Sequence, residues 1–200
     1  MYYSHIMLFG IAGPTASGKT TVTNLLVEKY DADYLRYSML LSDIATKRGL
    51  DPTDKATLQD LYVSLREERG EGWLAEEIAN RVEDEQKSEN LVIEGNRRKI
   101  DIETLKDVAD SRNEQLIFIF IDASVTTRFA RYNSRLEKQN KPPITFEEFE
   151  ILEKNAAEDE VDDLRQYAKA HGIYIDTDEH DIKSTENVLH QALSQKLHLF

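Results

Sequence analysis

The chain has 200 residues, a formal net charge of −13 at neutral pH and no cysteine. This length suits one α/β domain with a core of its own. The lack of cysteine excludes a disulfide framework, a thiolate metal site and a cysteine nucleophile, and the acidic balance argues against DNA or RNA as a standing partner, which would require a basic face.

The first predicted element is a short apolar strand over His5–Ile11, and a helix is predicted over Thr20–Lys29 from the spacing of its apolar residues. The loop Gly13–Thr20 reads GPTASGKT and matches the phosphate-binding pattern G-x-x-x-x-G-K-[ST] at every fixed position. Strand, glycine-rich loop and helix come in the required order, and the helix N-terminus directs its dipole toward an anion. The stretch therefore predicts a nucleotide-phosphate site.

The residue types of this loop follow from the chemistry of phosphate binding. Gly13 and Gly18 permit backbone dihedrals closed to other residues, so that successive N–H groups can turn toward phosphate oxygens. Lys19 can reach the β- and γ-phosphates, and the Thr20 hydroxyl can ligate Mg²⁺. We expect the donor nucleotide to be held by Gly13, Thr15, Ala16, Ser17, Gly18, Lys19, Thr20 and Thr21.

Strands and helices alternate along the rest of the chain. Strands are predicted at Asp33–Tyr37, Leu91–Glu94, Leu116–Ile121 and Ile173–Ile175. Helices are predicted at Met39–Arg48, from the turn Asp51-Pro52-Thr53 to Gly70, at Trp73–Lys87, Asp101–Ala109 and Ser124–Lys138, from a capping box at Thr145–Glu148 with interruptions to Ala170, and at Thr185–Leu197. This alternation predicts an α/β fold of the P-loop NTPase type, three-layer α/β/α, with a five-stranded parallel sheet and a helical lid.

Ligands of such sheets bind at the carboxyl ends of the strands. Arginines collect at these ends although the chain is acidic as a whole. The residues there are Arg36-Tyr37-Ser38 after the second strand, Glu94-Gly95-Asn96-Arg97-Arg98 after the third, Asp122 after the fourth and Asp176-Thr177-Asp178 after the fifth. Arg97, which comes just after Gly95, is the better candidate of its pair for an acceptor phosphate.

A stripe of arginines marks the helix that follows the fourth strand. Arg128, Arg131 and Arg135 lie at i, i+3 and i+7 and so share one face. Three neighbouring guanidiniums repel one another unless anions lie close by. One interpretation is a phosphate-clamping lid that neutralises charge on the transferring group. The other is a solvated basic face neutralised by the acidic segment Glu147–Asp163.

Two acidic residues end apolar strands. Glu94 stands where a strand-end carboxylate would hold Mg²⁺ or its waters, although Asp is the usual residue. The alternative is a carboxylate paired to Arg97 or Arg98. Asp122 can be interpreted as catalytic, but a residue in this position more often caps the next helix.

The residues as a set resemble the nucleoside monophosphate kinase group of P-loop kinases, including adenylate-kinase-like and dephospho-CoA-kinase-like proteins, and most nearly a family of small archaeal kinase-like proteins. The resemblance is carried by the loop GPTASGKT, by Arg36–Leu41 with Lys47–Leu50, by Leu65–Gly70, by Val92–Arg97, and by Thr127–Arg131 through Phe146–Phe149. The phosphate loop is its most specific part.

The resemblance implies transfer of the γ-phosphoryl group of ATP to a small, nucleotide-like acceptor, with ATP and Mg²⁺ as cofactors. It implies a single domain over residues 1–200, with an acceptor-binding helical segment at 38–88 and a lid at 124–165. The implied catalytic residues are Lys19, Arg128 and Arg131, and Arg128 is also implied to bind the donor nucleotide. The implied acceptor ligands are Arg36, Ser38, Arg66, Arg97, Arg131 and Arg135, and the implied metal ligands are Thr20 and Glu94.

Two departures from the family pattern bear on the chemistry. Dephospho-CoA kinases use an acid near the second strand, where this chain has Arg36-Tyr37-Ser38, and adenylate kinases carry Asp-Gly where it has Glu94-Gly95. The alternatives are a hydroxyl-directed kinase of dephospho-CoA or a nucleoside, an enzyme like the tRNA prenyltransferases, which share GPTASGKT, and a non-enzymatic nucleotide-binding switch.

The expected partners follow from the same features. We expect a small-molecule acceptor, no nucleic-acid polymer and no membrane, because the N-terminal apolar run is too short to span one. The chain is expected to be cytoplasmic and to act as a monomer or homodimer.

Overall fold

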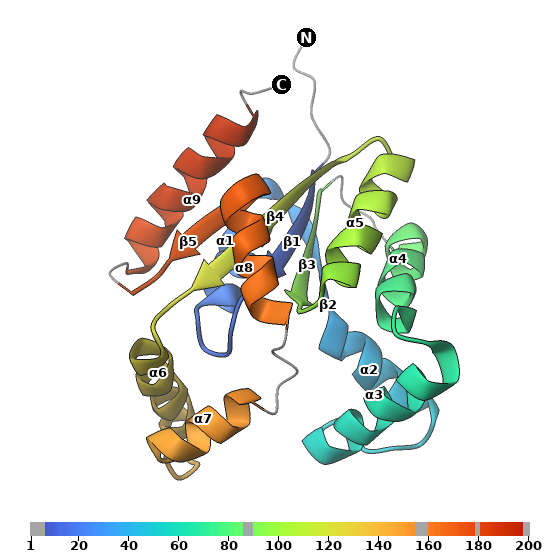
Figure 1. Cartoon of the computed structure of the whole chain (residues 1–200), viewed down its shortest axis with the longest axis vertical. Helices are drawn as coiled ribbons and strands as arrows, with labels where there is room; N and C mark the ends of the chain where they lie inside the picture. Colours follow the sequence, from blue (N-terminus) through green and yellow to red (C-terminus); the bar gives the residue numbers. More distant parts are fainter. Residues whose placement is uncertain (1–6, 86–89, 155–159, 179–180, 198–200) are drawn as a thin grey trace.

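The computed structural model describes residues 7–85, 90–154, 160–178 and 181–197. Its centre is one five-stranded sheet of β1 (Met7–Ala12), β2 (Ala32–Arg36), β3 (Asn90–Asn96), β4 (Gln115–Asp122) and β5 (Ile173–Asp176). The strand order is β2-β3-β1-β4-β5 and every pair is parallel (Figure 1). The predicted fold class is thereby confirmed.

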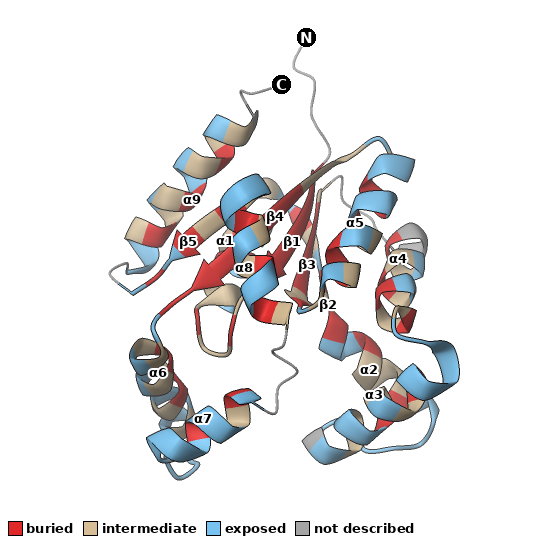
Figure 2. Ribbon diagram, viewed as in Figure 1, coloured by how far each residue is buried: buried red, intermediate tan, exposed pale blue. Residues whose placement is uncertain are grey.

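Helices cover both faces of this sheet because the strands alternate their side chains. Phe9 and Ile11 of β1 pack with the helices α1 (Lys19–Tyr30) and α9 (Ile182–Leu197) on one face. Leu8 packs with α4 (Trp73–Glu85) and α5 (Lys99–Ser111) on the other. α8 (Val161–His171) lies beside α5 on that second face, against Phe118 and Phe120 of β4. Figure 2 shows the resulting buried layer at the strands.

Two groups of helices extend beyond the carboxyl ends of the strands (Figure 1). One consists of α2 (Tyr37–Lys47), α3 (Lys55–Arg69) and the start of α4, packed around the buried ring of Trp73. The other consists of α6 (Val125–Lys138) and α7 (Phe146–Lys154). Its centre is Phe149, fully buried, with ring contacts to Phe129 and Tyr132 at centroid distances of 5.8 and 5.4 Å.

Local capping signals explain where several helices begin. Asp54 and Ser124 accept hydrogen bonds from the backbone N–H groups of Thr57 and Thr127, at 3.0 and 3.2 Å. The predicted capping box is confirmed: Thr145 N donates to Glu148 Oε2 at 2.7 Å and Glu148 N donates to Thr145 Oγ1 at 3.2 Å. Within the described residues, no helix combines the length and apolar character needed to span a bilayer.

Some predicted boundaries differ from those observed. Tyr37 begins α2 instead of ending β2, because its backbone turns helical directly after Arg36. The helical stretch predicted from Thr145 to Ala170 is two helices, α7 and α8, and α8 packs against the sheet rather than with α6 and α7. His5, Lys87 and the connection at 155–159 lie outside the described residues.

The junction of α8 and β5 yields a prediction about packing. A Cβ atom on Gly172 would lie 2.5 Å from the Phe118 carbonyl oxygen, whereas one on Gly72 would meet nothing closer than 3.6 Å. Gly172→Ala should therefore lower the free energy of unfolding by about 1–3 kcal/mol, the usual cost of forcing extra atoms into a packed interior. Gly72→Ala is the matched control and should be near neutral. Thermal unfolding measures both, and equal melting temperatures would show that α8 can shift away from β4 without cost.

Candidate functional site

The phosphate loop joins β1 to α1 with a backbone that requires glycine. Gly13 and Gly18 have φ of 144° and 105°, and Ala16 has φ of 62°. A Cβ on Gly13 would lie only 2.1 Å from the Ile121 carbonyl oxygen of β4. The loop therefore lies against β4 at the carboxyl end of the central strand β1, and α1 begins directly after it. This geometry suits an anion at the N-terminus of α1.

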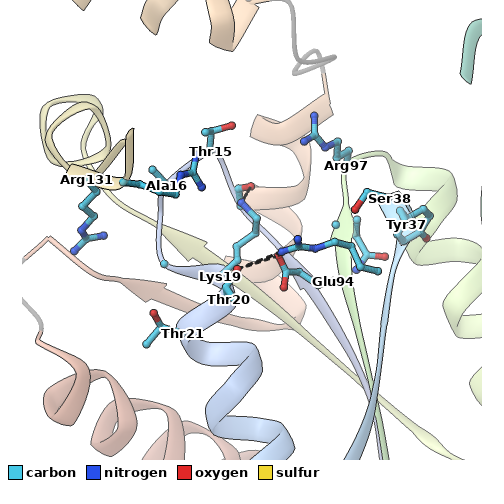
Figure 3. Close-up of a pocket in the computed structure, with 16 residues that line it drawn as sticks. Thr15, Ala16, Lys19, Thr20, Thr21, Tyr37, Ser38, Glu94, Arg97 and Arg131 are labelled. Atoms are coloured by element: carbon cyan, nitrogen blue, oxygen red, sulfur yellow. Dashed lines mark hydrogen bonds and ion pairs between the residues drawn. The ribbon is translucent and has the colours of Figure 1, made fainter. Parts of the chain in front are cut away.

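Lys19 lies across this loop. Its Nζ donates to the carbonyl oxygens of Gly13 and Pro14, at 2.8 and 2.7 Å. Figure 3 shows its side chain between Thr15 and Thr20, inside the curve of the loop. The ammonium group is therefore held at the mouth of the loop, where it can meet an incoming phosphate group.

A cleft of about 520 Å³ brings together the loop, the start of α1, the junction of β2 with α2, the end of β3 with the turn after it, and α6. It is lined by Gly13, Thr15, Ala16, Gly18, Lys19, Thr20, Thr21, Arg36, Tyr37, Ser38, Glu94, Gly95, Asn96, Arg97, Arg131 and Arg135. Five of these residues are cationic and Glu94 is the one acid among them. The cleft therefore suits an anionic ligand.

Glu94, the acid of the cleft lining, has a side chain that is only 3% exposed. Its Oε2 accepts from the hydroxyls of Thr23 and Tyr34, at 3.2 and 3.0 Å. Its Oε1 pairs with Arg36 and lies 3.5 Å from Thr20 Oγ1. Burial, followed by the nearby charge of Glu94, raises the pKa of Tyr34 to about 12, so its hydroxyl remains a donor at neutral pH.

The three arginines of the α6 stripe lie at different depths. Arg131 lines the cleft and donates to the carbonyl oxygen of Ser17 at 3.3 Å, and to Oγ1 and the carbonyl oxygen of Thr177 at 2.8 and 2.7 Å. Arg135 also lines the cleft, and stacks over the Tyr132 ring at 4.9 Å. Arg128 is buried, pairs with Glu153 of α7 and does not line the cleft.

The predicted acceptor ligands are partly brought together. Arg36, Ser38 and Arg97 all line the cleft. Figure 3 shows Ser38 and Arg97 on the side of the cleft opposite Arg131. The backbone N–H of Arg97 donates to Asp101 Oδ2 at 2.8 Å, which anchors this turn. Arg66 lies outside the lining, and its Nε is 3.2 Å from Glu71 Oε1.

Other residues contribute that sequence reasoning did not select. Tyr37, Gly95 and Asn96 line the cleft, and their place directly beside Arg36 and Arg97 was the available signal. Thr177, buried directly after β5, accepts from Arg131 through Oγ1, and its single hydroxyl proton lies within reach of the carbonyl oxygens of Ser17 and Asp122, at 2.8 and 3.0 Å. Thr177 thus connects the loop, the sheet and α6, a role that no sequence pattern indicates.

Asp122 lies outside the cleft lining. Its Oδ2 accepts from Arg165 Nε at 2.6 Å and from the Tyr174 hydroxyl at 3.1 Å. Burial and this carboxylate raise the pKa of Tyr174 to about 12. The helix-capping oxygen at this strand end belongs to Ser124 rather than to Asp122.

The donor set fits a magnesium nucleotide. Thr20 Oγ1 and Glu94 Oε1 lie 3.5 Å apart at the mouth of the loop, and Mg²⁺ binds proteins through one or two such oxygens together with phosphates and water. The described residues contain no group of three or more His, Asp or Glu side chains that could hold a metal ion. A metal ion in this cleft would therefore need phosphate and water oxygens as further ligands. Metal binding is therefore expected to accompany the nucleotide.

A family model described as "AAA domain" matches residues 12–150. No curated protein matches the chain.

Solved structures share the fold at low sequence identity. A shikimate kinase from Acinetobacter baumannii in complex with shikimate has 19% identity and a TM-score of 0.55, over 97% of this chain and 96% of that one. A gluconokinase from Sinorhizobium meliloti 1021 has 13% identity and a TM-score of 0.54, over 98% and 97%. TT1252 from Thermus thermophilus has 14% identity and a TM-score of 0.59, over 97% and 99%. The fold is that of the P-loop kinases.

The pairing of Arg36 with Glu94 yields a prediction about stability. The Arg36 side chain is 37% exposed and that of Glu94 is 3% exposed. Arg36→Gln should lower the free energy of unfolding by about 2–3 kcal/mol, because it leaves a buried carboxylate without its cation. Glu94→Gln should cost about 1 kcal/mol, because the guanidinium left behind can reach water. Urea unfolding measures both, and a larger cost for Glu94→Gln would contradict this asymmetry.

Proposed function

This chain belongs to the AAA-domain family, and from that premise we propose that it is an ATP-dependent phosphotransferase, with Mg²⁺, that moves the γ-phosphoryl group of ATP to a nucleoside monophosphate or a similar small nucleotide-like acceptor. The observation that carries the proposal is the convergence in one cleft of the phosphate loop with arginines from β2, from the turn after β3 and from α6. Phosphoryl transfer depends mainly on such positioning and charge neutralisation.

On the donor side, the loop amides from Gly13 to Thr20 would bind the phosphates, with Thr15, Ala16, Ser17 and Thr21 completing the site. Lys19 would move from the loop carbonyls to the β- and γ-phosphates. Mg²⁺, when bound, would neutralise charge between the phosphates, and Thr20 and Glu94 would hold it. Arg131 would neutralise the transferring group, and Arg128 would hold α6 above the loop, since its Nη1 lies 3.5 Å from the Thr15 carbonyl oxygen.

On the acceptor side, Arg36, Ser38, Arg97 and Arg135 would bind an anionic group. A phosphate acceptor is already a nucleophile and needs no general base. The cleft offers no other carboxylate than Glu94, and that carboxylate accepts hydrogen bonds or ion pairs from four side chains. This charge balance favours a phosphate over a hydroxyl as the group that attacks.

A second candidate is a kinase that acts on a hydroxyl. The observation in its favour is that solved structures with this fold include a shikimate kinase and a gluconokinase, named for small acids rather than nucleotides. Such an acceptor would place its carboxylate against Arg97 or Arg36. It would also require Glu94 to give up its present partners to act as a base.

The experiment that tests the proposal is an acceptor screen with ATP, Mg²⁺ and detection of ADP. Nucleoside monophosphates should accelerate ADP formation well above the rate with ATP alone. Faster turnover with nucleosides, dephospho-CoA, shikimate or gluconate would favour the second candidate. ATP hydrolysis that no acceptor accelerates would instead favour a nucleotide switch and contradict transfer.

The position of Arg131 yields a kinetic prediction. Because it lies beside the loop at Ser17, Arg131→Ala should lower kcat at least tenfold and weaken ATP binding by a smaller factor. Lys19→Ala is the reference for loss of the donor site and should abolish transfer without lowering the melting temperature. Arg135→Ala, one turn later on α6, is the matched control and should mainly raise the KM for the acceptor. A pure KM effect of Arg131→Ala would remove it from the transfer step.

A further inference from the structure

We infer that Arg36 gates the metal site of this enzyme, and that an anionic acceptor opens the gate by drawing the guanidinium away from Glu94. The inference rests on the proposed function, because it concerns how the two substrates of one cleft are coupled. It assigns Arg36 a second role: besides binding the acceptor, this residue controls when Thr20 and Glu94 are available to a cation.

The first observation is that one nitrogen of Arg36 contacts both expected metal ligands. Nη2 lies 3.3 Å from Thr20 Oγ1 and also donates to Glu94 Oε1. Those two oxygens are themselves 3.5 Å apart. A guanidinium in this place and a metal ion on the same two oxygens exclude each other, both by space and by repulsion between cations.

The second observation is that the pair is built into the sheet. Arg36 is the last residue of β2 and is in register with Glu94 of β3, so the two side chains start from neighbouring positions. In a parallel pair, residues in register project from the same face of the sheet. The contact therefore follows from strand pairing rather than from a chance meeting of long side chains.

The third observation is that Glu94 has anchors besides Arg36. Its Oε2 is held by the hydroxyls of Thr23 and Tyr34, at 3.2 and 3.0 Å, while only Oε1 faces Arg36 and Thr20. The carboxylate is nearly buried, whereas the Arg36 side chain is 37% exposed. Rotation of Arg36 into the cleft would thus free one preorganised oxygen without moving the other.

The fourth observation concerns what would draw Arg36 away. The acceptor side of the cleft also contains Ser38 and Arg97, and the remaining lining residues include no second carboxylate. An acceptor phosphate placed among these residues would offer Arg36 an alternative anion with bidentate geometry. Coupling of this kind is reciprocal, so the anion should tighten metal binding as much as the metal tightens anion binding.

The test measures cation affinity directly, without turnover. Mn²⁺ replaces Mg²⁺ as an electron paramagnetic resonance probe, with ADP as the nucleotide. In the wild-type protein, AMP should tighten Mn²⁺ binding by about tenfold, and adenosine, which lacks the phosphate, should not. Arg36→Gln should bind Mn²⁺ about tenfold more tightly than the wild-type protein before any acceptor is added, and AMP should add nothing further.

The matched control is Arg135→Gln, which removes one positive charge from the same cleft lining but leaves Arg36 on Glu94. It should require more AMP to saturate, but at saturating AMP it should retain the full effect of AMP on Mn²⁺ affinity. If Arg36→Gln tightens Mn²⁺ binding no more than this control does, general electrostatics explains the change and the gate is refuted. If Arg36→Gln fails to fold, the wild-type protein still tests the gate, because AMP should tighten Mn²⁺ binding and adenosine should not. Equal Mn²⁺ affinities with AMP and with adenosine would refute it.

A calorimetric titration with ADP distinguishes failure of the Arg36 gate from failure of the proposed function. If ADP and Mn²⁺ bind but AMP leaves Mn²⁺ affinity unchanged in the wild-type protein, the gate is overturned and the proposed function stands. If ADP does not bind at all, the proposed function fails and the gate fails with it.

Discussion

The parallel pairing of β1 with both β3 and β4 is the constraint on which the site depends. It brings the carboxyl ends of the three central strands to one edge, so that the phosphate loop lies between the turns that follow β3 and β4. The approach is close enough that Gly13 has no room for a side chain beside the Ile121 carbonyl. The same pairing places Glu94 near Thr20, although 74 residues separate them along the chain.

The cleft at this edge of the sheet is basic, although the chain as a whole is acidic. A chain of net charge −13 directs five cationic side chains into one cleft. Two of them are held on uncharged oxygens of the protein: Lys19 on loop carbonyls and Arg131 on Ser17 and Thr177. Arg36 is held by the buried Glu94. Such contacts keep the cations in place while leaving them able to exchange partners for phosphate oxygens.

The two helical groups that flank the cleft have small cores of their own. Trp73 is buried among α2, α3 and α4, and Phe149 is buried between α6 and α7. Each group can therefore keep its internal packing while the residues that it contributes to the cleft meet a ligand: Tyr37 and Ser38 from α2, and Arg131 and Arg135 from α6. This arrangement would suit the proposed phosphotransferase, which must surround two substrates and exclude water.

The amino-acid sequence by itself determined the phosphate loop, the alternation of strands and helices, and the choice of the strand ends as the site, because these depend on local patterns of glycine, apolar spacing and capping. Only the tertiary structure decided which charges meet. Arg36 contacts Glu94 through the register of β2 and β3, whereas Arg66 lies beside Glu71 and Arg128 beside Glu153, away from the cleft lining. Long charged side chains have several partners within reach, and strand register and helix packing select among them, which no periodicity along the chain records.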